Sequence, residues 1–97
     1  MTIQINTDKN IESSARLETY LKSVITEELS RFSDKITRIE LHLSDENAAK
    51  EGVNDIKCLL EARLNNKQPI VVTNQANSIE KAFSDALAKL KSTLGKK

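Results

Sequence analysis

Hydrophobic residues along the chain follow two different periods, and the switch between them predicts the order of the elements. Near the N-terminus two isoleucines alternate with polar residues, which is typical of a half-buried strand over residues 2–6. After a short turn, apolar residues recur at steps of three and four, which predicts an amphipathic helix. Its apolar stripe comprises Leu17, Tyr20, Leu21, Val24, Ile25, Leu29 and Phe32. Ser13 or Ser14 can supply the N-cap oxygen, and residues 33–35 end the helix.

The middle of the chain returns to a period of two, which predicts two further strands joined by a loop. In residues 36–44 leucine and isoleucine point inward, while polar side chains including His42 point outward. Residues 45–54 are polar and contain a glycine, so we expect a loop. Residues 56–64 form the next strand. Its inward face comprises Ile56, Cys58, Leu60, Ala62 and Leu64.

A hairpin and a second amphipathic helix complete the pattern. Residues 65–68 read as the hairpin turn, since asparagine tolerates positive φ better than most residues, and residues 69–73 as a fourth strand. Residues from 74 onward enter the helix, where Asn77 and Glu80 resemble a capping box. Gly95 stands where a left-handed C-terminal residue is expected. The buried stripe comprises Ile79, Ala82, Phe83, Ala86, Leu87, Leu90 and Leu94.

This order of elements, β-α-β-β-β-α, predicts the fold. The strand–helix–strand crossover should be right-handed and make the first two strands parallel, whereas the hairpin-joined strands are antiparallel. Each strand has one apolar face, so both helices should cover one face of the sheet and leave the other to water. We therefore expect a two-layer α+β sandwich with a four-stranded mixed sheet, formed by residues 1–97 as a single domain.

Composition narrows the class of protein. The net charge is +1 with 30% charged residues, which fits neither a disordered chain nor a strongly basic nucleic-acid binder. Any binding of an anion must therefore come from the distribution of charge. The single cysteine cannot form an intramolecular disulfide, which suits a reducing cytosol. No signal-like or membrane-spanning apolar run is present, so we expect a soluble cytoplasmic protein.

The chain shows few signs of catalytic chemistry. His42 is a lone histidine on a solvated strand face, so an ordinary surface residue is favoured over a pH switch or a ligand. Cys58 falls on the apolar face and should pack as a small hydrophobe. Asp45 and Asn47 begin like a calcium loop, but the required glycine and glutamate are missing, so a turn is favoured. We therefore expect that the protein is not an enzyme and that it binds no metal, cofactor or small-molecule substrate.

Basic residues on the two helices give the better binding signal. The predicted helices could lay these residues against a phosphate backbone, where each neutralised phosphate releases counterions. The alternative is that both faces are merely solvated, because acidic residues share the same helices. No aromatic stacking platform is present, so recognition of RNA would rest on shape and phosphate. The basic residues on or beside the helices are Arg16, Lys22, Arg31, Lys35, Lys81, Lys89, Lys91, Lys96 and Lys97.

The ordered set of these segments resembles the hibernation-promoting factor family, also called the ribosome-associated inhibitor or sigma-54 modulation (ribosomal S30AE) family. The resemblance spans nearly the whole chain and rests on the full set, because no single motif is diagnostic. The segments that carry it are "IQIN", "LETYLKSVI", "RFSDKITRIELHLS", "CLLEARL", "QPIVVT" and "IEKAFSDALAKLKSTL". Because the sequence stops at Lys97, it is similar to the short form, without the C-terminal dimerisation domain of long members.

The resemblance implies a factor that binds the small ribosomal subunit near the decoding centre, where mRNA and tRNA would sit, and holds ribosomes idle without catalysis. Basic residues on the helices would contact ribosomal RNA. Lys89 matches a lysine of the family, whereas Glu27 and Glu28 stand where basic residues are usual and Glu80 where a tyrosine is common. The expected phosphate contacts are Lys22, Arg31, Lys81, Lys89, Lys91 and Lys96.

A second hypothesis is a protein–protein interaction module on the same scaffold. The uncovered sheet face or the edge strand at residues 69–73 could pair with a partner or with a second copy of the chain. This alternative would not involve the ribosome. A monomer is favoured over a dimer, and size-exclusion mass with and without RNA would distinguish the two hypotheses.

Overall fold

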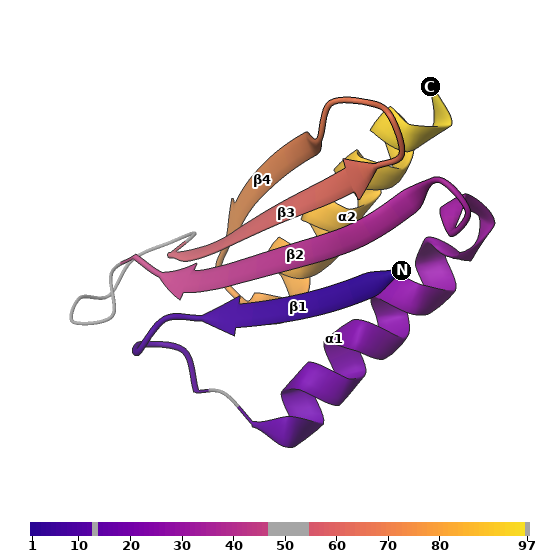
Figure 1. Ribbon diagram of the computed structural model, residues 1–97. Helices are drawn as coiled ribbons and strands as arrows, with labels where there is room; N and C mark the ends of the chain where they lie inside the picture. The colour runs from indigo at the N-terminus through magenta and orange to yellow at the C-terminus, as the bar shows by residue number, and fades with distance from the viewer. Residues whose placement is uncertain (13, 47–54, 97) are drawn as a thin grey trace.

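Two helices lie on one face of a four-stranded sheet in the computed structural model, which describes residues 1–12, 14–46 and 55–96 (Figure 1). This arrangement confirms the predicted two-layer α+β fold and the order of its elements. In chain order the elements are β1 (Thr2–Thr7), α1 (Ala15–Glu28), the 3-10 helix η1 (Ser30–Phe32), β2 (Ile36–Asp45), β3 (Ile56–Leu64), β4 (Ile70–Ala76) and α2 (Ile79–Gly95).

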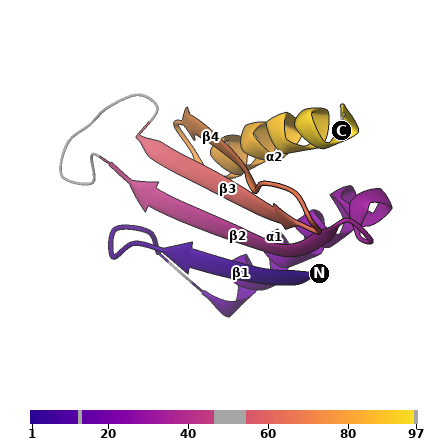
Figure 2. The same ribbon diagram turned by 45° about the horizontal axis from the view of Figure 1, so that its top comes forward.

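The strands lie side by side in the order β1-β2-β3-β4, as Figure 2 shows. β1 pairs with β2 in parallel, and the other two pairings are antiparallel, as predicted. The registers align one apolar row across all four strands, which consists of Ile5, Leu41, Leu60 and Val72. Since side chains alternate between faces, the neighbouring rows must point to the open side of the sheet.

The core lies between this sheet and the helices and is almost wholly aliphatic, as the composition predicts. Phe83 is among its largest fully buried side chains, and Phe32 is its other aromatic residue. The two central strands contribute most of the buried residues of the sheet, at every second position from Ile39 in β2 and from Cys58 in β3. Burying a Leu, Ile or Phe side chain contributes about 1.5–3 kcal/mol. The core residues from the sheet with 0% exposure are Ile39, Leu41, Cys58, Leu60 and Ala62.

The first helix begins as predicted and ends earlier. Ser14 is the N-cap, and its Oγ accepts a hydrogen bond from the backbone N–H of Leu17 at 3.1 Å. The α-helix stops at Glu28, and Phe32 reaches the core from the separate turn η1. The assignment of Tyr20 to the buried stripe was wrong, because its side chain is 46% exposed. Tyr20 lies at the side of α1 facing α2, where the helices leave an open groove.

The boundary between β4 and α2 differs from the prediction. β4 runs to Ala76 and not to residue 73, because its polar end keeps its register with β3. The prediction that Asn77 and Glu80 form a capping box was wrong. Ser78 is the N-cap, and its Oγ accepts from the backbone N–H of Lys81 at 3.1 Å.

The predictions for Gly95, for the hairpin turn and for the loop at residues 45–54 have different outcomes. Gly95 was expected to adopt a left-handed conformation after the helix, but it lies inside α2, and the C-cap Lys96 has φ −93°. The hairpin turn is confirmed, with Asn66 at φ 59°. The loop prediction for residues 45–54 is tested only at its start, where Asp45 ends β2; residues 47–54 lie outside the described residues.

Within the described ranges, no helix is long and apolar enough to cross a membrane.

Cys58 should make the protein less stable at alkaline pH. Burial raises the pKa of its thiol from 9.0 to about 12. The unfolded chain therefore releases this proton above about pH 9 while the folded chain keeps it, so the free energy of unfolding falls by up to about 1.4 kcal/mol per pH unit between these values. Below pH 9.0 the contribution is complete and constant. Denaturant unfolding of the wild type and Cys58→Ala from about pH 8 to about pH 11 measures this loss. Equal pH slopes for both proteins would contradict it.

The N-cap of α2 gives a second prediction. Replacing Ser78 with alanine removes the acceptor for the Lys81 N–H and should lower the free energy of unfolding by about 1 kcal/mol. Asn77→Ala is the matched control and should change it by less than about 0.5 kcal/mol. Urea unfolding curves measure both, and the reverse ranking would restore Asn77 as the cap.

Candidate nucleic-acid interface

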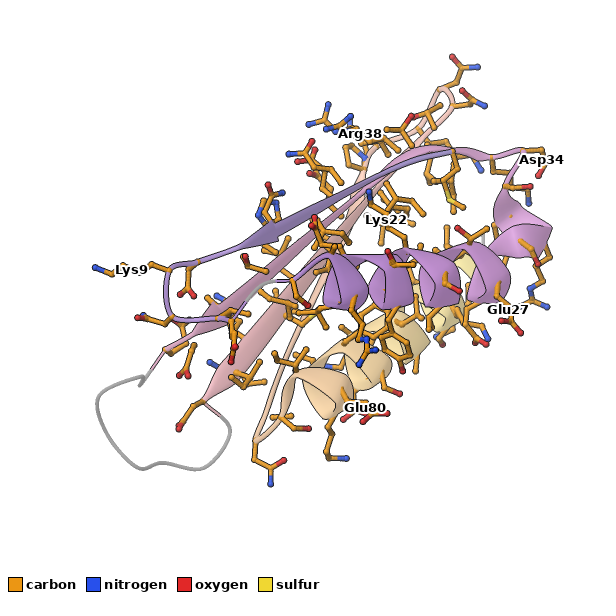
Figure 3. The ribbon with its side chains drawn as sticks, turned by 90° about the horizontal axis from the view of Figure 1, so that it is seen from below. Lys9, Lys22, Glu27, Asp34, Arg38 and Glu80 are labelled. Atoms are coloured by element: carbon orange, nitrogen blue, oxygen red, sulfur yellow. The ribbon has the colours of Figure 1, made fainter. Side chains whose placement is uncertain are left out.

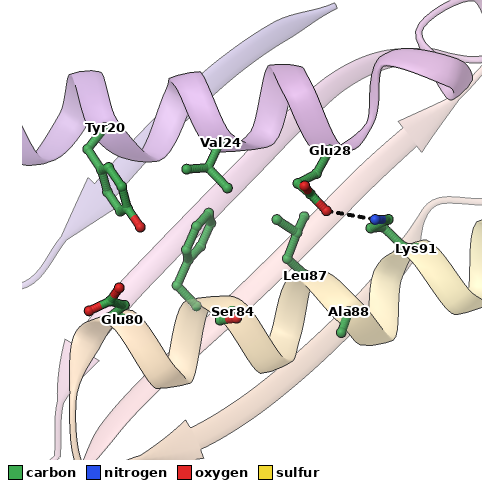
Figure 4. A pocket seen from close by; sticks show the side chains of 9 residues that line it. Tyr20, Val24, Glu28, Glu80, Ser84, Leu87, Ala88 and Lys91 are labelled. Atoms are coloured by element: carbon green, nitrogen blue, oxygen red, sulfur yellow. Dashed lines mark hydrogen bonds and ion pairs between the residues drawn. The ribbon is translucent and has the colours of Figure 1, made fainter.

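The two helices run side by side in the same direction, so their outer surface forms one layer (Figures 1 and 4). The parallel direction follows from the sheet, because β1 and β4 point the same way and each is followed by a helix that returns along it. This layer carries the six residues predicted to contact RNA. The structure shows which of these six residues lie close to one another.

The lysines late in α2 point to opposite flanks of the helix. Successive helical residues are rotated by about 100°, so two positions apart they diverge widely. Lys91 reaches across to α1, where its Nζ lies 2.6 Å from Glu28 Oε1. Lys89 turns to the sheet, and its Nζ donates to the carbonyl oxygen of Thr73 in β4 at 2.9 Å. Although only two positions apart in sequence, these two cations therefore serve different surfaces.

Lys81 and Lys22 lie apart from that pair. Lys81 forms an ion pair with Asp85 one turn later, with Nζ 3.5 Å from Oδ2. Lys22 lies on the flank of α1 turned away from α2, as Figure 3 shows, beside Thr26 and Glu27. The predicted residues on the two helices therefore do not form one continuous basic patch.

Arg31 lies at the end of the helix layer where both helices finish. Its guanidinium stacks over the ring of Phe32, 4.6 Å from the centroid. One guanidinium nitrogen lies beside Gly95 in the last turn of α2, 3.8 Å from where a Cβ atom would stand. Arg31 is thus placed next to Lys96, the C-cap of α2. Cations at helix C-termini also stabilise the helix by about 0.3–1 kcal/mol.

Two further lysines reach the same end of the molecule. Lys35 and Lys67 both line a small cavity of about 260 Å³ there, together with Leu94 of α2. The hairpin turn is tied to the residues after η1, because the Asn65 backbone N–H donates to the carbonyl oxygen of Lys35 at 3.0 Å. We name the set Arg31, Lys35, Lys67 and Lys96 the basic end.

The basic end brings together four cations from three separate segments of the described chain. None of its four members forms an ion pair with a described acidic residue, and Asp34 is the acid beside them. The sequence prediction included Arg31 and Lys96 but not Lys35 or Lys67. Parallel helices bring both C-termini together, and the hairpin turn supplies Lys67, so only the topology could have indicated the set.

The open face of the sheet carries mixed charge that is largely compensated internally. Glu40 lies at its centre, with its carboxylate 3.3 Å from Arg38 Nε, 3.7 Å from Arg63 Nη2 and 3.8 Å from His42 Nε2. His42 is exposed, as predicted. Among the described side chains, no group of three or more His, Cys, Asp or Glu could hold a metal ion.

A groove of about 480 Å³ separates the helices at their outer surface (Figure 4). We call it the interhelical groove. Its lining comprises Tyr20, Val24 and Glu28 of α1 and Glu80, Phe83, Ser84, Leu87, Ala88 and Lys91 of α2. Its polar rim is more acidic than basic, so this part of the helix layer differs in charge from the basic end.

The fold and its helix layer define a class of known proteins. The crystal structure of the Protein Y N-terminal domain from Thermus thermophilus superimposes with a TM-score of 0.75, at 15% identity over 96% of this chain and 94% of that chain. A ribosomal subunit interface protein from Coxiella burnetii has a TM-score of 0.65, at 19% identity over 99% of this chain and 96% of that chain. At these identities the likeness concerns the fold.

The sequence itself shows the family. Residues 3–97 match the family described as Sigma 54 modulation protein / S30EA ribosomal protein. The chain therefore belongs to that family, as the resemblance of its segments predicted. Among curated proteins, none matches the sequence.

The ion pair between the helices should be weak. The Lys91 and Glu28 side chains are 36% and 43% exposed, so water and salt screen their attraction. A double-mutant cycle with Lys91→Gln and Glu28→Gln should give a coupling of about 0.2–1 kcal/mol that falls with added salt. Urea unfolding of the four proteins measures it. A salt-independent coupling above about 2 kcal/mol would mean that this pair holds the helix layer together.

Proposed function

We propose that this protein is a ribosome-associated hibernation factor that binds the small ribosomal subunit and inhibits translation. Membership of the S30EA family supports the ribosome as partner. The proposed act is binding and not catalysis, and it takes place in the cytoplasm. Residues 1–97 would form the ribosome-associated domain.

The basic end is the observation that carries this proposal. Four cations from three separate parts of the chain converge where both helices finish, with no described ion pair to neutralise them. Such a group can neutralise neighbouring phosphates of ribosomal RNA and release their counterions. Arg31 and Lys96 are therefore the leading contacts among the six predicted residues, with Lys35 and Lys67 added beside them.

The other predicted lysines serve as secondary contacts. Lys81 and Lys91 hold exposed ion pairs, which contribute only about 0–1 kcal/mol, so a phosphate can take the place of the carboxylate. Lys89 donates a hydrogen bond to Thr73 and would have to leave it. Lys22 acts from the far flank of α1. Changing Lys89 and Lys91 to glutamate should weaken binding without altering sequence preference, since phosphate contacts carry no sequence information.

Co-sedimentation with purified small subunits tests the proposal. The wild type should pellet with subunits at low salt and be released steeply as salt rises. The double variant Arg31→Glu, Lys96→Glu should bind at least about tenfold more weakly, and its salt slope should fall by about two. Lys9→Glu is the matched control, because Lys9 lies at the opposite end of the molecule from Asp34 (Figure 3).

Two results would overturn the proposal. Wild-type protein that stays in the supernatant even at low salt would show that the ribosome is not the partner. If Lys9→Glu and Arg31→Glu lose the same affinity for the small subunit, only the net charge of the protein matters and the basic end is not a binding site. Circular dichroism of each variant confirms that it is folded.

A protein–protein module on the edge strand β4 is the second candidate. Val71 of this strand is 54% exposed, and the sheet ends there in the described structure. Lys89, however, bonds the Thr73 carbonyl of the same strand, and lysine at an edge hinders pairing with another strand. A dimer that ignores salt and RNA in size-exclusion chromatography would favour this function over ribosome binding.

A further inference from the structure

The interhelical groove has an apolar floor and polar ends. Val24, Phe83 and Leu87 form the floor between the two helices. At the end formed by the start of the helices, Tyr20 and Glu80 point toward one another across the opening (Figure 4). At the other end the ion pair of Glu28 and Lys91 bridges the groove at 2.6 Å. A bound chain would therefore meet an apolar slot with a carboxylate and a phenol at its entrance.

Tyr20 is unusual among the aromatic residues of this chain. The sequence has one tyrosine, two phenylalanines and no tryptophan. Both phenylalanines are buried, whereas Tyr20 is 46% exposed at the rim of the groove. An aromatic ring left accessible beside an apolar slot offers a surface on which a planar cation can stack.

The charge of the groove favours a cation over a phosphate. Lys91 is paired with Glu28, and the remaining charged residue of the lining is Glu80 in the first turn of α2. Within the described chain, no ion pair joins Glu80 to a cation, Arg16 one turn before Tyr20 included. A carboxylate at this entrance repels RNA phosphates and attracts an ammonium or guanidinium group. The groove is therefore unsuited to the nucleic acid that the basic end can bind.

We propose that the interhelical groove docks a basic segment of a partner protein. An arginine of the segment pairs with the Glu80 carboxylate and stacks on the Tyr20 ring, because guanidinium groups combine both interactions. A neighbouring apolar side chain lies against Val24, because Phe83 and Leu87 are only 2% and 4% exposed. The volume of about 480 Å³ accommodates two such side chains. This interaction goes beyond the proposed RNA contact and does not depend on it.

Fluorescence anisotropy with a labelled peptide tests the docking without ribosomes. The probe is a short peptide of alternating arginine and leucine, and glutamate replaces arginine in the matched peptide. The full chain should bind the arginine peptide and not the glutamate peptide. Glu80→Gln and Tyr20→Ala should each weaken binding by about five- to tenfold. Glu27→Gln is the matched control, because Glu27 lies on α1 outside the groove lining, and its affinity should match the wild type.

A second measurement guards against loss of folding and against general charge attraction. Amide chemical shifts of labelled wild-type protein should move on addition of the arginine peptide at Tyr20, Ser84 and Ala88, and stay fixed at Lys35 and Lys67. Both variants must show dispersed native spectra. With net charge +1, the chain has little general attraction for a cationic peptide.

Three outcomes would overturn the docking proposal. The first is equal loss of peptide affinity in Glu27→Gln and Glu80→Gln. The second is displacement of the peptide from the groove by an RNA hairpin, which would make the groove part of an RNA site. The third is a concentration-dependent dimer abolished by Glu80→Gln, which would make a second copy the occupant. Failure of ribosome sedimentation with intact peptide binding would refute the proposed function alone.

Discussion

The parallel packing of the two helices on one face of the sheet is the constraint on which the rest of the structure depends. β1, β2 and β4 run the same way, and α1 and α2 each return from one of these strands along the same face. Both helices therefore begin at one end of the molecule and finish at the other. Their C-termini carry the negative ends of two aligned dipoles, where Arg31 and Lys96 gather. The basic end is thus a consequence of topology as much as of composition.

The same packing separates two kinds of surface on one small layer. Where the helices finish, Lys35 and Lys67 stand without described ion pairs. Where they begin, Glu80 and Tyr20 border the interhelical groove. The interactions along the layer are exposed ion pairs worth about 0–1 kcal/mol each, whereas the buried aliphatic side chains contribute about 1.5–3 kcal/mol each. Polar partners on the surface can therefore be exchanged without endangering the fold.

Several charges on the sheet surfaces outside the helix layer already have partners. On the open face, Arg38, Arg63 and His42 surround the Glu40 carboxylate. At the β4 edge, Lys89 holds the Thr73 carbonyl. The Lys89 side chain therefore serves the sheet edge in this structure. Lys91, two positions later, lines the interhelical groove instead, because the rotation between successive helical residues separates the two side chains.

The sequence by itself determined what depends on local periodicity. The alternation in β2 and β3, the burial of Cys58 and the positive φ in the hairpin all follow from neighbouring residues, and so does the fold class. Tertiary structure decided the rest. The polar end of β4 is a strand only because β3 pairs with it, and Tyr20 is exposed because α1 and α2 leave an open groove between them. Lys35 and Lys67 line one cavity with Leu94 of α2 because packing joins segments that are distant in the chain, and no local pattern records such contacts.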